Sequence, residues 1–152
     1  MKLAEALQER ADLNRKIEQL DNRLKNNALV QEGEKTDEDP KTLLKELDDC
    51  VERLEKIMAD INLTNSQTFV EGKSLTEIIA RKDALMRKLT VYRSLISQAG
   101  YKTMRARGSE IKILSTVNVA SLQKKADDIS KEIRQLDNTL QENNWKSDLL
   151  ER

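Results

Sequence analysis

Apolar residues recur at three- and four-residue spacings along four stretches of the chain, with charged residues between them. This spacing is typical of amphipathic helices, and it predicts helices over about residues 2–28, 40–61, 75–99 and 119–143. At 1.5 Å per residue, helices of this size are roughly 30 to 40 Å long. Because an isolated helix is marginally stable in water, each apolar seam is expected to lie along a partner helix of similar length.

Residues at the helix ends support these boundaries. Asp39 precedes Pro40, which places an N-cap side chain before a proline at the first helical position. Asn118 stands in the N-cap position of the last predicted helix. Polar residues interrupt otherwise aliphatic seams at Arg10, Asn27 and Lys82, and such positions usually fix the register between helices or reach the end of a bundle.

The second predicted helix carries an unusually wide apolar stripe. Its main seam is widened on one side by Leu44, Val51 and Met58. A stripe of this width predicts contact with more than one neighbour, as in a bundle, and not the narrow seam of a two-stranded zipper.

Two connecting segments are longer than a helical bundle requires. Residues 62–73 lose the helical period, and Thr68 to Val70 before Glu71 and Gly72 predicts a short strand entering a turn. Residues 110–119 alternate apolar and polar side chains. This alternation predicts a second strand in the long segment 101–117, ahead of the next helix. We therefore expect the two long loops to pair as a small β-ribbon.

The predicted fold is mostly α: a single domain over residues 1–152, formed as an antiparallel four-helix bundle of two long helical hairpins, with the small β-ribbon from the long loops. The composition agrees with this class. Of 152 residues, 38% are apolar and only 3% aromatic, with four glycines and one proline, which favours long solvated helices over a barrel or a wound sheet.

Histidine is absent, which removes histidine-based acid–base catalysis, the Ser-His and Cys-His nucleophile pairs and every imidazole metal site. The carboxylates of the second predicted helix alternate with lysine and arginine, so a solvated charged face is favoured over a metal site. Cys50 lies on an apolar seam, which favours a buried packing thiol. We expect no cofactor, no metal and no enzymatic activity.

The chain has 27 basic and 27 acidic side chains, but they are unevenly distributed. Residues 1–70 hold 11 basic and 16 acidic groups, whereas residues 71–112 hold 10 and 4. Within the basic 81–112 region, Lys102, Arg105, Arg107 and Lys112 are candidates for binding a phosphate or another anion. The alternative is that the basic residues of the third predicted helix, such as Arg81 and Lys82, pair with the acidic faces of the first two helices. We expect no nucleic-acid partner, because interleaved aromatic residues are missing.

The carboxy-terminal segment 145–152 is an apolar tail. Asn143 and Asn144 interrupt the helical period, so Trp145, Leu149 and Leu150 need not continue the seam of the last helix. A tryptophan beside two leucines is typical of an anchor residue in an interface, which makes the tail a candidate assembly segment. The alternative is that the tail folds back over the open end of its own bundle.

The start at Met1 lacks the pattern of a secretory leader, and no apolar run approaches the roughly 18 residues of a membrane span. The single cysteine favours a reducing compartment. We expect a cytoplasmic protein with no membrane partner.

Short motifs spread over nearly the whole chain resemble a family of small bacterial proteins labelled septicolysin. The motifs are Asp39–Pro40, Thr64–Asn65, Ala80–Leu85, Ser109–Lys112, Thr116–Val119, Asn144–Trp145 and Asp148–Leu149. The family has no established activity, so the resemblance assigns no catalytic residues. Its label implies a membrane-active cytolysin, but the chain lacks an apolar hairpin able to insert, and we do not expect that activity.

Taken from the sequence, the favoured function is protein–protein association, with copies of the same chain as the expected partner. The alternative is a binding module that holds a phosphate-bearing or other anionic ligand through the basic 81–112 region.

Overall fold

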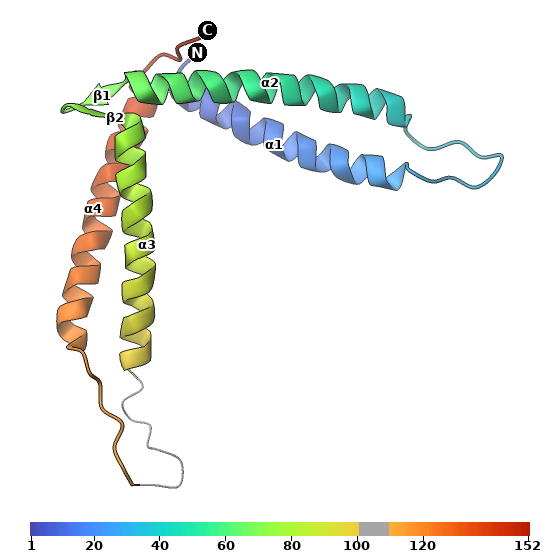
Figure 1. Ribbon diagram of the computed structural model, residues 1–152. Coiled ribbons are helices and arrows are strands. Elements are labelled where there is room, and N and C mark those ends of the chain that lie inside the picture. The colour runs from blue at the N-terminus through green and yellow to red at the C-terminus, as the bar shows by residue number, and fades with distance from the viewer. Residues whose placement is uncertain (101–109) are drawn as a thin grey trace. The chain divides into compact units, whose positions relative to one another are not determined.

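Figure 1 shows the computed structural model of the chain, in which residues 1–100 and 110–152 are described. Helices account for most of these residues: α1 (Leu3–Asn26), α2 (Pro40–Gln67), α3 (Leu75–Ala99) and α4 (Val119–Lys146). A two-stranded antiparallel sheet, β1 (Phe69–Val70) and β2 (Lys73–Ser74), lies between α2 and α3 along the chain. The mostly helical class and the four predicted helices are confirmed.

Contacts divide the described residues into two compact units. The first unit comprises Met1–Ser74 with Asn143–Arg152, and the second comprises Leu75–Glu142. Each unit contains one pair of long helices side by side, α1 with α2 and α3 with α4 (Figure 1). The two predicted hairpins are present, and each packs the seams of its own two helices into a core of its own. The single domain over residues 1–152 stays a prediction.

The core of the first unit follows the predicted seams of α1 and α2. Leu20, Leu43 and Cys50 are buried together, with half-buried leucine and isoleucine side chains from both helices around them. Nearer the amino end of α1, Leu3 and Ala6 are completely buried, as is Ile57 on α2. The Cys50 thiol is therefore a packing group in this core, as its position on the seam predicts.

Charged pairs on one side of the α1–α2 contact fix its register. Arg53 of α2 holds Glu9 of α1 in a two-pronged contact, with 2.8 Å between Nη2 and Oε2. Lys16 of α1 lies 3.1 Å from a carboxylate oxygen of Glu46. Since these pairs join residues 30 to 44 positions apart in the chain, a slip of one helix along the other would break them together.

The open end of the first hairpin is tied by Asn27, one of the polar residues on the predicted seams. Asn27 is buried, and its side-chain nitrogen donates to the Arg23 carbonyl oxygen at 2.8 Å. Its side-chain oxygen accepts from the backbone N–H of Glu38 at 3.0 Å, and the Glu38 carboxylate in turn binds the Arg23 guanidinium. Asn27 thus connects the end of α1 to the residues that precede α2.

The second unit has an equivalent core between α3 and α4. Leu85 and Leu89 of α3 are buried with Ala126 and Ile129 of α4, and half-buried side chains extend the cluster along both helices. Lys82, a polar residue on the α3 seam, is satisfied by an ion pair to Asp137 at 2.7 Å. This pair fixes the register of α3 and α4, which is the role predicted for such a seam position.

In the described part of the chain, the β-ribbon forms within one connecting segment, between α2 and α3. Phe69 pairs with Ser74 and Val70 with Lys73, and the intervening Glu71 and Gly72 have φ values of 49° and 82°. Two successive positive φ values define a tight hairpin turn that matches the twist of the strands, for which glycine is well suited. Among the described residues, the strand at 69–70 thus pairs within its own segment and not with residues 110–117; the rest of the predicted partner segment, 101–109, lies outside the described residues.

Two other boundaries differ from the sequence prediction. Residues 62–67 continue α2 as helix, and residues 110–118 form no strand that extends the β1–β2 sheet. The helix caps are confirmed: an Asp39 side-chain oxygen accepts from the Lys41 N–H, and the Asn118 side chain accepts from the Ser121 N–H, both at 3.0 Å. Capping requires only local chemistry, whereas strand formation requires a partner strand.

Replacing a fully buried seam residue should destabilise the first unit. Leu20→Ala is expected to cost about 2–5 kcal/mol, because it removes packing and leaves a cavity between α1 and α2. Gln19→Ala, one position away on the exposed face, is the control and should change stability by less than about 0.5 kcal/mol. Urea unfolding monitored by circular dichroism measures both, and equal stability of the two variants would mean that the seam is misplaced.

Acid should destabilise the hairpins through their paired carboxylates. The hydrogen bond from Arg53 lowers the pKa of Glu9, and the one from Arg23 lowers the pKa of Glu38. Since the unfolded chain binds these protons more tightly, this stabilisation is present above about pH 4.5 and is lost as the pH falls further. In the double variant Glu9→Gln/Glu38→Gln, the unfolding free energy should decline less steeply between pH 5 and 3 than in the wild type. The control Glu18→Gln should show the same dependence of unfolding free energy on pH as the wild type.

Candidate assembly surfaces

The carboxy-terminal tail packs against its own first unit. Its backbone exchanges hydrogen bonds with the amino terminus: the Leu3 N–H donates to the Ser147 carbonyl at 3.0 Å, and the Leu149 N–H donates to the Met1 carbonyl at 2.8 Å. An ion pair of 2.8 Å between Lys2 and Asp148 reinforces this two-sided contact. The two termini of the chain are therefore held together, as Figure 1 shows.

The tail also contacts the last turns of α2. The Leu150 N–H donates to the Thr64 hydroxyl at 2.9 Å, and that hydroxyl donates to the Asp60 carbonyl at 2.7 Å. The Arg152 N–H lies 3.3 Å from a side-chain oxygen of Asp60. Thr64 and Asp60 are both buried, so the tail supplies a polar partner to α2 where water is excluded.

Of the two arrangements considered for the tail, the fold-back onto its own unit is the one the structure contains. Leu149 is half-buried there, while Leu150 remains 42% exposed. Trp145, in the last turn of α4, is 54% exposed. The tail thus has a role within the chain, and Trp145 and Leu150 are its large apolar residues that stay exposed.

Sequence reasoning missed Asp60 and Thr64 as functional positions. Polar residues from Asn62 to Gln67 predicted a loop, but Ile57, Asp60, Ile61 and Thr64 follow the same helical spacing and are all buried. Continuation of that spacing was the available signal. Tertiary contact with the tail overrides the weak helix propensity of this polar stretch.

A second apolar surface lies on α2. Leu44, Val51 and Met58 are spaced seven residues apart, and their side chains are 49%, 47% and 45% exposed. We call these three residues the α2 face. It lies beside the buried seam of α2 and extends along roughly 21 Å of helix. The wide stripe predicted two neighbours for this helix, but the first unit supplies only α1, so the outer part of the stripe remains uncovered.

The predicted anion-binding residues are only partly placed. Lys102, Arg105 and Arg107 lie outside the described residues, and Lys112 is exposed. Two further bases of the 81–112 region are held by carboxylates of α4: Arg81 lies 3.1 Å from Glu132, and Lys82 pairs with Asp137. These bases pair with α4, where the sequence analysis expected acids of the first two helices.

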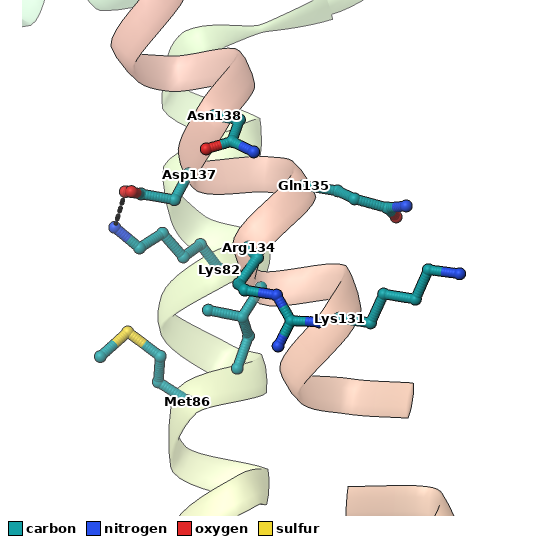
Figure 2. Close-up of a pocket in the computed structure, with 8 residues that line it drawn as sticks. Lys82, Met86, Lys131, Arg134, Gln135, Asp137 and Asn138 are labelled. Atoms are coloured by element: carbon teal, nitrogen blue, oxygen red, sulfur yellow. Dashed lines mark hydrogen bonds and ion pairs between the residues drawn. The ribbon is translucent and has the colours of Figure 1, made fainter. Parts of the chain in front are cut away.

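An open groove of about 560 Å³ runs between α3 and α4 in the second unit (Figure 2). Lys82 and Met86 line it from α3, and Lys131, Arg134 and Asp137 are among its lining residues on α4. Figure 2 shows the ion pair between Lys82 and Asp137 among the lining residues, and its hydrogen bond lowers the pKa of Asp137. One of the three cations is therefore already neutralised, which weakens this groove as an anion site.

In the described part of the chain, no group of three or more cysteine or carboxylate side chains is arranged to hold a metal ion. Across residues 1–100 and 110–152, no helix is long and apolar enough to cross a membrane.

Comparison with known proteins gives a family and a fold without an activity. Residues 10–149 match the model of a family described as "Family of unknown function (DUF6847)". A crystal structure of a functionally unknown conserved protein from Corynebacterium diphtheriae is 39% identical in sequence, covers 99% of each chain and superposes with a TM-score of 0.93. No curated protein matches the chain.

Removing the Thr64 hydroxyl should loosen the tail. Thr64→Val keeps the shape of the side chain but leaves the Leu150 N–H without its acceptor, which is expected to cost about 1–3 kcal/mol. Thr42→Val, at an exposed position of the same helix, is the matched control. Urea unfolding gives the loss of stability, and hydrogen exchange at the Leu150 amide should accelerate in the Thr64 variant alone; unchanged exchange there would show that this contact does not hold the tail.

Proposed function

We propose that this chain, which belongs to the family of unknown function DUF6847, works by association with copies of itself. The observation that carries the proposal is the α2 face, where three large apolar side chains are about half exposed at a regular heptad spacing. Apolar residues in a continuous stripe on a helix are typical of a helix–helix contact, whereas single exposed apolar residues need no explanation.

The construction of the first unit supports this proposal. Two antiparallel helices bury one seam between them, and Leu47 and Leu54 at the edge of that seam are only half-buried. A further helix laid along the α2 face would cover the outer stripe and these two leucines at once. The contact would convert the helical pair into the multi-helix packing that the sequence of α2 favours.

The proposed role is structural and not catalytic. Histidine is absent from the sequence, and Cys50 is buried in the core. We also propose a cytoplasmic location, supported by this single unpaired cysteine. The resemblance to septicolysin stays a prediction and adds no activity to the proposal.

Anion binding through the 81–112 region is the competing proposal, and salt separates the two. Apolar contacts persist at high ionic strength, whereas a complex between a phosphate group and lysine or arginine weakens steeply. The pairing of Arg81 and Lys82 with α4 carboxylates favours association over anion binding.

Placing a charge in the α2 face should abolish association. The wild type is expected to elute as an oligomer in size exclusion with light scattering from 0.1 to 1 M NaCl, while Val51→Asp should run as a folded monomer, because a carboxylate cannot be buried there without a partner. Lys56→Asp puts the same charge on the opposite, exposed side of α2 and should keep the oligomer. A wild type that is monomeric at every concentration would refute the proposal.

A further inference from the structure

The α2 face has an acidic margin on the side away from α1. On the α1 side of α2, Glu46 and Arg53 are bound by charged residues of that helix. On the other side, Asp48 and Glu55 follow Leu44 and Val51 by one turn, are exposed, and form no ion pair with any described base. Whatever covers the α2 face therefore meets these two carboxylates along its edge, of which Asp48 also interacts electrostatically with Lys45.

A second exposed apolar stripe, bordered by basic residues, lies on α3. Val91 and Leu95 are 66% and 39% exposed, and Ala84 extends their line toward the start of the helix. We call Ala84, Val91 and Leu95 the α3 face; it extends along roughly 16 Å of helix. None of these three belongs to the cluster packed against α4, so this face is separate from the core of the second unit.

Two bases border the α3 face. Arg87 and Lys88 lie between Ala84 and Val91 in the sequence, at the three- and four-residue spacings that bring them beside both on a helix. Both are exposed, and neither forms an ion pair with a described acid. The Lys88 ammonium lies 5.7 Å from the centre of the Tyr92 ring, a contact that leaves its positive charge uncompensated.

We propose, on the basis of the self-association argued above, that the α2 face of one copy packs against the α3 face of a second copy. Both stripes are apolar along the middle, and their margins have opposite charge. Opposite charges at the rim of an interface select the partner and fix its register, while the apolar centre supplies most of the affinity.

Charge disfavours the simpler pairing of two α2 faces. In that arrangement Asp48 and Glu55 of both copies would line the same contact, and like charges set against each other oppose association. A contact between two different faces is heterologous, so each copy has one acidic-margin face and one basic-margin face to offer. Both faces are exposed in the single chain, which leaves each available to another copy.

The test uses charge reversal in two separate proteins. In the double variant Asp48→Lys/Glu55→Lys, the margins of the α2 face and the α3 face are both basic. In the double variant Arg87→Glu/Lys88→Glu, both margins are acidic. Each variant alone should therefore show at least a tenfold weaker self-association, measured by sedimentation or light scattering. An equimolar mixture should regain the wild-type mass, because each variant offers the face that the other needs. All four substitutions in one chain should restore association without a partner.

Controls with the same change of charge lie off both faces. The double variants Glu18→Lys/Glu32→Lys and Lys124→Glu/Lys125→Glu alter exposed positions and should leave the mass of the assembly unchanged. Circular dichroism should show the same helix content in every variant.

If the wild type associates and Val51→Asp dissociates it, but the charge reversals have no effect, the α3 face is the wrong partner and the proposed function stands. A mixture that stays dissociated also overturns the inference, since the faces would then not join two copies. A monomeric wild type refutes both proposals.

Discussion

The burial of one apolar seam between two antiparallel helices is the constraint on which the rest of this structure depends. A helix of 24 to 28 residues has too little stability by itself, so each one requires a partner along most of its length. In each unit that partner is the neighbouring helix in the sequence, and the buried residues are those of the three- and four-residue seam. A pair of helices has no third layer, and so it cannot cover a stripe wider than one seam. The exposure of Leu44, Val51 and Met58 follows directly from this limit.

Because aliphatic seams tolerate sliding, polar contacts determine how the helices are aligned. Arg53 with Glu9 sets the alignment of α1 and α2, and Lys82 with Asp137 sets that of α3 and α4. These pairs lie at the edges of the seams and are partly exposed, so each contributes little to stability, but each is broken by a shift of one residue. At the ends of the first unit, Asn27 and the carboxy-terminal tail act in the same way through hydrogen bonds to backbone groups.

The uneven distribution of charge gives the margins of the two exposed stripes opposite charge. Acidic residues predominate in the first 70 positions and basic residues in 71–112, while the whole chain is neutral. Segregation of charge within a neutral chain allows one part of a molecule to attract an oppositely charged part of an identical molecule. The acidic margin of the α2 face and the basic margin of the α3 face are the local form of this segregation, and they connect the composition of the chain to its proposed function.

The sequence by itself determined the features that depend on neighbouring residues. The helical seams, the caps at Asp39 and Asn118, the turn at Glu71–Gly72 and the burial of Cys50 all follow from spacing and local chemistry, and the structure contains each of them. Tertiary structure decided the features that depend on a distant partner. Residues 62–67 are helical although their polar side chains favour a loop, because the tail supplies hydrogen bonds to Thr64 and Asp60 from 86 and 92 positions away. Where the tail lies and which part of a wide stripe stays exposed were likewise settled by contacts between segments, since spacing along a chain specifies a face but not what covers it.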